Sequence, residues 1–564
     1  MTTHLTRREF MGAAAATALI PLFPRIVVGE RIALGPFAVP AQPQNAMDRD
    51  LLEVTILRLH ALYDARKYTA TQVTRWYLDR IAKYDRVYRA ILHVDTAGAL
   101  ATAAAQDAAA KAGGTRLKRG PLWGVPIVIK ANTSVKGLVT SAGWSGYLIP
   151  GHELVAPMDA TVVAKLKAAG AIILGQTNMP DFAASDTNIS SAFGRTGNAY
   201  NYRFSPGGSS GGTVTAVAAN FCVLGTGTDT GNSIRMPSGT SAVVGFLPTR
   251  GLVSIAGIHP LDWLLDNTGP IARDVSDVAI ALDVMAGEDP RDFRTKDSAT
   301  QAQPGPYALF ARAGALNGKR FGVPAFIVRA ASGSVTGDDG LTLQPETREL
   351  FMKALDGLRA AGATVVFDDA ILPASFLGLV NGVNTQPYRG EGTENFLRDF
   401  GPAEYHSMAE YAQAVGSPLP PMVRGVSAAP QPSAANTQRV LENDPAADAT
   451  FWQPQRKALA AYEDALDRFQ LNGMVYPAIQ MPPNDELLPL LEGRRSNGPH
   501  SQTAWVNPLG VPAVSVPGGF YANGLPFGLE FSARRWRDGD LMGWAFAYEQ
   551  ATKHRRVPVL RERR

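Results

Sequence analysis

Two glycine- and serine-rich segments close together in the chain constrain its fold more than any other feature. The first is PGGSSGG at 206–212, and the second is GTGTDTGNSIR at 225–235. The uncharged residues between them, 214–223, predict a buried helix that carries Cys222 as an inert core thiol. Glycine lets a backbone turn tightly and approach other groups, although such segments are equally common as flexible connections.

Helix-like and strand-like segments alternate around these two loops, which is typical of a layered α/β fold. After Thr69, apolar residues recur at the spacing of an amphipathic helix. Further helices are expected at 97–112, 161–169 and 346–361, and strands at 126–130, 171–174, 364–367, 474–476 and 513–516.

Residues 385–470 are polar, rich in helix-like segments and proline, and without clear strands. Long irregular excursions in compact domains are often functional, so we interpret this stretch as an insertion that covers a site. Its aromatic residues either pack the insertion, which we favour, or line a pocket for bulky or aromatic substrates. Among them are Tyr388, Phe396, Tyr405, Tyr411 and Trp452.

The formal net charge of +4 arises at the C-terminus, where the segment from Lys553 onward contains six basic residues and only one glutamate. The rest of the chain is therefore nearly neutral, which excludes an electrostatic surface for nucleic acid. Cys222 is the only cysteine, so the chain has no intrachain disulfide and no cysteine-based zinc site. The eight histidines show no metal-binding spacing.

The N-terminus contains Arg7-Arg8-Glu9-Phe10 and then an uncharged, moderately apolar run at 12–24. Paired arginines before such a run predict a twin-arginine signal peptide at 1–29, followed by a proline-bearing linker at 30–45. We therefore expect a periplasmic or secreted protein that the twin-arginine export machinery translocates; the alternative is a basic N-terminal arm. The apolar run is too short to span a membrane, and no other stretch predicts a transmembrane helix.

Several catalytic and binding motifs compete for the glycine-rich segments. A phosphate-binding loop needs a lysine, which both segments lack, and a Rossmann fingerprint fails because Thr230 stands where its third glycine belongs. The nucleophile elbow Gly-x-Ser-x-Gly matches at Ser209 and Ser210, but residues 201–206 before it form a poor strand. An α/β-hydrolase-like esterase with one of these serines and a histidine such as His500 stays an alternative.

An ordered set of longer motifs is more specific. They are GVPIVIK at 124–130, TNMPDFA at 177–183, FG at 193–194, GGSSGG at 207–212, GTGTDTGNSIRMP at 225–237, GFLPT at 245–249, DNTGPIAR at 266–273 and ANGLPFGL at 522–529. Together they resemble the amidase signature family. The resemblance implies one large α/β/α sandwich with a central mixed β-sheet over 46–564, with a variable substrate-covering region at about 385–500.

The resemblance also implies a Ser–Ser–Lys triad. Ser233 is then the nucleophile, Ser209 the bridging serine after a cis peptide bond with Gly208, and Lys130 the base. A serine hydroxyl is a weak nucleophile until a base takes its proton, and a lysine is such a base only where burial disfavours its ammonium form. Lys130 ends an apolar run, which suits this role. Taken in isolation, it is better interpreted as a strand-end lysine that reaches solvent.

Other residues of the same segments are expected to assist this triad, and no metal or organic cofactor is implied. Backbone N–H groups stabilise an oxyanion when they are aimed at the charge that develops in the transition state. The expected oxyanion hole is the backbone of Thr230, Gly231 and Asn232, and the expected supporting residues are Ser210, Asp229 and Arg235.

Two positions depart from the family pattern. Ala131 follows the lysine where the family commonly has Asp, and the missing carboxylate makes a neutral Lys130 easier to form. Asn232 precedes the nucleophile where the family usually has Gly, and Asn tolerates a positive φ better than other residues. We expect the Asn232 side chain to narrow the acyl pocket or to donate to the substrate.

These residues predict an exported amidase that hydrolyses a small-molecule carboxylic amide through an acyl-enzyme on Ser233. Bulky or aryl amides, peptide amides, carbamates and esters are the candidate substrates. Besides the esterase, the alternatives are an amidotransferase-type subunit of the same family, which makes glutaminyl-tRNA with a partner, and a noncatalytic binding protein.

Overall fold

The computed structural model describes residues 45–113, 118–329, 343–425, 439–494 and 501–562. The predicted signal peptide and all of the predicted linker except Asn45 lie outside these ranges, as does His500.

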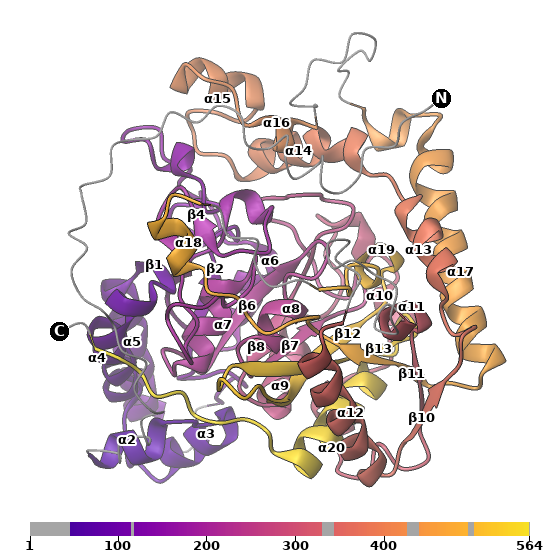
Figure 1. The fold of residues 1–564 in the computed structure, drawn as a ribbon. Coiled ribbons are helices and arrows are strands. Elements are labelled where there is room, and N and C mark those ends of the chain that lie inside the picture. Colours follow the sequence, from indigo (N-terminus) through magenta and orange to yellow (C-terminus); the bar gives the residue numbers. More distant parts are fainter. Residues whose placement is uncertain (1–44, 114–117, 330–342, 426–438, 495–500, 563–564) are drawn as a thin grey trace.

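A mixed sheet of 11 strands forms the centre of the described structure, in the order β1-β3-β2-β6-β8-β7-β12-β13-β11-β9-β10 (Figure 1). Strand β2 is parallel to β3 and β6, whereas β8 is antiparallel to both β6 and β7. The sheet strands are β1 (Ile91–Val94), β2 (Pro126–Lys130), β3 (Ile172–Thr177), β6 (Leu224–Asp229), β7 (Val244–Leu247), β8 (Asn267–Ala272), β9 (Arg320–Val323), β10 (Thr364–Phe367), β11 (Gly473–Pro477), β12 (Ala513–Phe520) and β13 (Pro526–Ala533), with β4 (Ile189–Ser190) and β5 (Gly194–Arg195) in a separate pair.

Helices cover both faces of this sheet, which confirms the expected α/β sandwich. Adjacent residues of a strand point to opposite faces. On β13, Glu530 contacts Arg235 of α8, whereas the next residue, Phe531, packs against Tyr548 of α20. The helices are α2 (Ala46–Leu51), α3 (Ile56–Asp64), α4 (Ala70–Tyr88), α5 (Thr96–Gly113), α6 (Thr161–Ala168), α7 (Gly211–Ala218), α8 (Arg235–Gly239), α9 (Val275–Met285), α10 (Ser298–Gln301), α11 (Ala325–Arg329), α12 (Pro345–Ala360), α13 (Ala374–Asn381), α14 (Arg389–Phe400), α15 (Met408–Val415), α16 (Pro421–Arg424), α17 (Gln453–Arg468), α18 (Leu487–Leu491), α19 (Val506–Leu509) and α20 (Asp538–Thr552).

The expected helices and strands are present, with boundaries set by local chemistry. Helix α4 begins after Thr69, whose side chain forms a capping box with Gln72. The helix expected at 214–223 differs: α7 begins at Gly211 and ends at Ala218. Asn220 is in the left-handed region, at a φ of 58°, and turns the chain toward β6. Cys222 is buried in this turn, and burial raises the pKa of its thiol to about 12, as expected for an inert thiol.

The stretch from α13 to α17 contains helices and no strand among its described residues, and α14, α15 and α16 lie together at the top of Figure 1. Tyr388, Phe396, Tyr405 and Tyr411 are buried within apolar clusters, and Trp452 is partly buried against one of them. Phe396, Tyr405 and Tyr411 pack with Tyr147 and Phe182 of the α/β body. The favoured interpretation, that these side chains pack the insertion, is confirmed.

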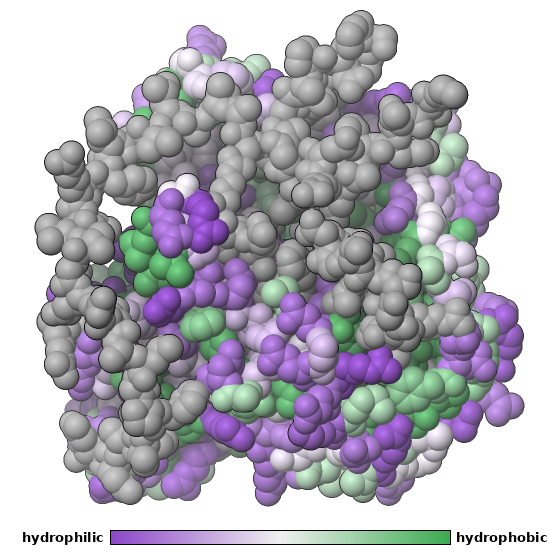
Figure 2. Space-filling model, viewed as in Figure 1, coloured by the Kyte–Doolittle hydropathy of each residue, from purple (hydrophilic) through white to green (hydrophobic). Residues whose placement is uncertain are grey.

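The face shown in Figure 2 mixes polar and apolar residues, with a green patch where α18 lies. Leu488, Leu490 and Leu491 of this helix are exposed. Among the described helices, none has both the length and the apolar character needed to cross a membrane.

Candidate active site

The candidate site lies at one edge of the sheet, where β2 and β6 end. Because the two strands are parallel neighbours, the residues at their C-terminal ends, Lys130 and Asp229, lie at the same edge. The first glycine-rich segment, 206–212, leads into α7, which begins at Gly211. The second segment is a loop only in part: residues 225–229 form most of β6, and residues 230–234 form the loop between β6 and α8.

Lys130 is fully buried at the end of β2. Its Nζ lies 2.8 Å from Oγ of Ser209, 3.0 Å from Oγ of Ser210 and 3.3 Å from the carbonyl oxygen of Thr228. Burial lowers the pKa of Lys130 to about 7, although the carboxylates of Asp229 and Asp266 act in the opposite direction. The lysine does not reach solvent, so its amine is partly neutral near pH 7 and can accept a proton.

The loop at 206–210, which carries Ser209 and Ser210, is hydrogen-bonded to the loop at 230–234, here called the Ser233 loop. The peptide bond between Gly208 and Ser209 is cis, as the family resemblance implied. The backbone N–H of Ser210 donates to the carbonyl oxygen of Ser233 at 3.2 Å, and the hydroxyl of Ser210 donates to the carbonyl oxygen of Thr228 at 3.2 Å. Ser210 thus contacts both the lysine and the Ser233 loop.

Ser233 lies between β6 and α8 and keeps 6% of its surface exposed, whereas Ser209 is fully buried. Within the part of the chain that the structure describes, the backbone N–H groups of Gly231, Asn232 and Ser233 donate to no protein acceptor. A row of free N–H groups beside a serine hydroxyl is the arrangement that an oxyanion hole requires. The hydroxyl of Thr230, at the start of this row, donates to Asp266.

Asn232 behaves differently from the expectation based on its backbone. It is not among the residues with a positive φ, so the tolerance of asparagine for that conformation plays no part here. Its side chain is buried, and Nδ2 has no hydrogen-bond partner among the residues that the structure describes. Leaving a buried donor unpaired costs on the order of 1–3 kcal/mol of folding free energy. An unpaired donor beside Ser233 therefore calls for an explanation, and a hydrogen bond to a bound ligand is one.

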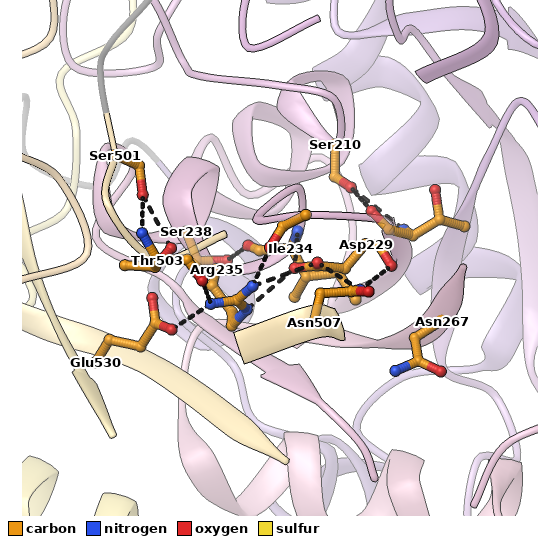
Figure 3. A network of polar contacts seen from close by, with 12 residues as sticks. Ser210, Asp229, Ile234, Arg235, Ser238, Asn267, Ser501, Thr503, Asn507 and Glu530 are labelled. Atoms are coloured by element: carbon orange, nitrogen blue, oxygen red, sulfur yellow. Dashed lines mark hydrogen bonds and ion pairs between the residues drawn. The ribbon is translucent and has the colours of Figure 1, made fainter. Parts of the chain in front are cut away.

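A buried charged network lies beneath the Ser233 loop (Figure 3). Nε of Arg235 lies 3.2 Å from Oδ2 of Asp229, and the same carboxylate oxygen accepts the backbone N–H of Ile234 at 3.0 Å. The guanidinium also donates to Glu530, to the carbonyl oxygen of Gly231 and, at 3.0 Å, to that of Thr503. Asp229 and Arg235 therefore pair their charges and hydrogen-bond the backbone of the Ser233 loop.

Burial and charge pairing together determine the pKa values of the ionisable groups in and around this network. Burial acts to lower the pKa of Arg235, but the carboxylates of Asp229 and Glu530 outweigh it and raise that pKa, so the guanidinium stays charged. Burial raises the pKa of Glu530 to about 7, partly offset by Arg235. Burial also raises the pKa of Asp266 to about 7.

The sequence analysis assigned no role to three residues of this region, although one of them, Asp266, begins the DNTGPIAR motif. Glu530 contacts Arg235, Asn507 donates through Nδ2 to the backbone oxygen of Asp229 at 2.8 Å, and Asp266 accepts from Thr230. A signal was available for Glu530, because a lone acidic residue between Leu529 and Phe531 in a buried strand needs a cationic partner.

The esterase alternative receives little support from this geometry. Residues 201–206 form no strand of the sheet, so the strand that a nucleophile elbow requires is missing before Ser209 and Ser210. Both serines instead contact the amine of Lys130.

In the described ranges, no group of three or more His, Cys, Asp or Glu residues is arranged to hold a metal ion.

Comparisons with known proteins identify the family of this chain. A family model described as Amidase matches residues 72–542. A glutamyl-tRNA(Gln) amidotransferase subunit from Symbiobacterium thermophilum is 33% identical over 520 residues, which cover 90% of this chain and 98% of that protein. The structure of native peptide amidase from Stenotrophomonas maltophilia is 30% identical, with a TM-score of 0.71 and coverage of 90% of this chain and 98% of that one.

A bacterial aryl acylamidase described as an amidase signature enzyme shares the fold at a TM-score of 0.69, with 22% identity and coverage of 88% of this chain and 96% of that one. The family match extends through both glycine-rich loops and the C-terminal strands of the sheet. The chain therefore belongs to the amidase signature family.

Proposed function

We propose that this protein hydrolyses the C–N bond of a carboxylic amide through an acyl-enzyme on Ser233. The observation that carries this proposal is the contact of 2.8 Å between Nζ of the fully buried Lys130 and Oγ of Ser209. A lysine with a pKa near 7 is matched to general-base catalysis at neutral pH.

In the proposed reaction, Oγ of Ser233 attacks the amide carbonyl carbon while its proton passes to Ser209, whose own proton moves to Nζ of Lys130. The free N–H groups of the 231–233 loop stabilise the oxyanion, and one such donor is worth about 3 kcal/mol. The protonated lysine returns the proton through Ser209 to the leaving amine as the C–N bond breaks. Water then attacks the acyl-enzyme by the same relay and releases the acid.

The proposed substrates are bulky or aryl amides and peptide amides, with carbamates and esters as further candidates. Similarity to a peptide amidase over nearly the whole chain supports the peptide amides. The buried aromatic residues of the insertion belong to its packing, so substrate selectivity is assigned to the remaining surface around Ser233.

We also propose that the protein is exported to the periplasm or beyond by the twin-arginine machinery. The support is the Arg7-Arg8-x-Phe10 sequence before a moderately apolar run. Twin-arginine substrates cross the membrane already folded, so an exported protein with a single cysteine and no intrachain disulfide is consistent with this route.

A second candidate function is an amidotransferase-type subunit. It is favoured by 33% identity to the glutamyl-tRNA(Gln) amidotransferase subunit over 98% of that protein. The export sequence argues against it, because glutaminyl-tRNA is made in the cytoplasm. Purification of the protein from its own cells distinguishes the two: a monomeric hydrolase carries neither a partner protein nor RNA, whereas the amidotransferase candidate brings both.

Labelling with a fluorophosphonate tests the proposed function, because this reagent needs an activated serine next to an oxyanion hole. We expect the wild-type protein to be labelled and Ser233→Ala to be neither labelled nor active on any of a panel of aliphatic amides, anilides, peptide amides and carbamates. Ser532→Ala is the matched control and should stay labelled, because the Ser532 hydroxyl lies 3.1 Å from that of Tyr462 and contacts no residue of the proposed triad. A folded wild-type protein without labelling or turnover would indicate a noncatalytic binding protein.

A further inference from the structure

The Arg235 guanidinium joins three distant parts of the chain beneath the Ser233 loop (Figure 3). It contacts Asp229 at the end of β6, the carbonyl oxygen of Thr503, and Glu530 on β13, which is 295 residues further along the chain. The side chains of Arg235, Asp229 and Glu530 are all fully buried. A buried cation that touches two carboxylates is held strongly in place, because any movement leaves an unpaired buried charge.

One contact of this guanidinium determines the direction of a backbone group in the candidate oxyanion hole. Nη2 of Arg235 donates to the carbonyl oxygen of Gly231. The peptide bond between Gly231 and Asn232 is not among the cis bonds of the structure, so it is trans. In a trans peptide, C=O and N–H point in opposite directions. With the Gly231 carbonyl held toward Arg235, the N–H of Asn232 points away from the network, and this N–H has no protein acceptor among the described residues.

We propose that Glu530 is a positioning residue for catalysis: it holds the Arg235 guanidinium against the Gly231 carbonyl and thereby directs the N–H of Asn232 toward the substrate carbonyl oxygen. This inference rests on the proposed hydrolase function. Glu530 touches neither the substrate nor the reacting serine, and it acts only through Arg235. Asp229 alone does not determine the guanidinium orientation, because its carboxylate also accepts the Ile234 N–H and an N–H of Asn507.

Three substitutions of Glu530 separate positioning from folding. Glu530→Gln keeps an acceptor oxygen for Arg235 at nearly the same place, whereas Glu530→Asp withdraws the carboxylate by one methylene group and Glu530→Ala removes it. Ser532→Ala is the matched control, because Ser532 is a buried polar residue on the same face of β13 whose hydroxyl lies 3.1 Å from that of Tyr462 in α17.

The variants are compared by kcat and KM on an anilide, by the second-order rate of fluorophosphonate labelling, and by Tm. Loss of a whole oxyanion donor costs about 10²–10³ in kcat, so a misdirected one should cost about 10–100-fold. We expect that loss in Glu530→Ala, a smaller loss in Glu530→Asp, and recovery to within about threefold of wild type in Glu530→Gln. KM should stay within about twofold, labelling should slow in parallel with kcat, and Ser532→Ala should keep its kcat even where its Tm falls.

Several results would overturn the inference. They are a wild-type kcat in Glu530→Asp or Glu530→Ala, a rise in KM at constant kcat, labelling that does not slow with kcat, failure of Glu530→Gln to recover, or an equal loss of kcat in Ser532→Ala. If Glu530→Ala does not fold, Glu530→Asp and Glu530→Gln decide the question. A wild-type protein that is neither active nor labelled contradicts the proposed function itself, whereas an active, labelled wild type with unaffected Glu530 variants contradicts only the role of Glu530.

Discussion

The pH dependence of kcat/KM tests whether the Lys130 amine is the base. A lysine ordinarily has a pKa of 10.5, and burial lowers that of Lys130 to about 7. A shift of this size corresponds to a net destabilisation of the ammonium form by about 5 kcal/mol. The loss of solvation exceeds the stabilisation that Asp229 and Asp266 provide. Because the neutral amine is the reactive form, activity should rise as pH passes the pKa of Lys130 and then level off.

The magnitude follows from a single titration with a pKa of about 7. The neutral fraction is about 0.09 at pH 6 and about 0.9 at pH 8, so kcat/KM should rise about tenfold over this interval and change little from pH 8 to 9. A solvent-exposed lysine at 10.5 predicts a rise of about a hundredfold over the same interval and a further rise up to pH 10. The assay is initial-rate hydrolysis of one anilide from pH 5 to 10 at constant ionic strength.

Two substitutions identify the titrating group. Ala131→Asp adds a carboxylate next to Lys130, which at about 6 Å and an effective dielectric of about 20 raises the pKa of the amine by about two units. The rise of kcat/KM with pH, called the acidic limb of the profile, should therefore shift to higher pH. Asp266→Asn removes a carboxylate that raises the pKa of Lys130, so the limb moves down. Loss of the limb in Asp266→Asn would assign it to Asp266, whose own pKa is about 7. An unmoved limb in Ala131→Asp, or a rate that still climbs tenfold per pH unit above pH 9, would refute the reasoning.

Two further predictions concern the same site. Lys130→Met should abolish turnover yet raise Tm at pH 6, because the folded state binds the lysine proton less tightly than the unfolded state. This penalty on folding is complete below the folded pKa of about 7 and disappears as pH rises toward 10.5, so the Tm advantage of the variant should shrink by pH 10; an advantage independent of pH would contradict it. Asn232→Gly should change the ratio of kcat/KM between bulky and small acyl groups, because it removes a buried amide whose Nδ2 has no partner in the described part of the chain. An unchanged ratio over the hydrolysis panel would show that this side chain does not contact the substrate.

Patterns along the chain are sufficient to place the main elements and the chemistry-bearing residues. The apolar spacing after Thr69 and the apolar run that ends at Lys130 depend only on neighbouring residues, and both appear as α4 and β2. The sequence pattern places the end of α7 too late, because uniformly uncharged sequence hides a helix end. The left-handed conformation of Asn220 determines that end and is a property of the folded turn.

The sequence by itself determined which residue types stand at the ends of β2 and β6, since strand periodicity and glycine content act over a few residues. Only the tertiary structure decided that Glu530 and Asn507, both more than 250 residues from their partners, support the Ser233 loop. It also decided the ionisation of Lys130, because a pKa depends on how completely the whole fold removes water from the amine and on which carboxylates it brings near. Local pattern specifies a side chain, whereas desolvation and long-range charge pairing exist only once the chain has folded around it.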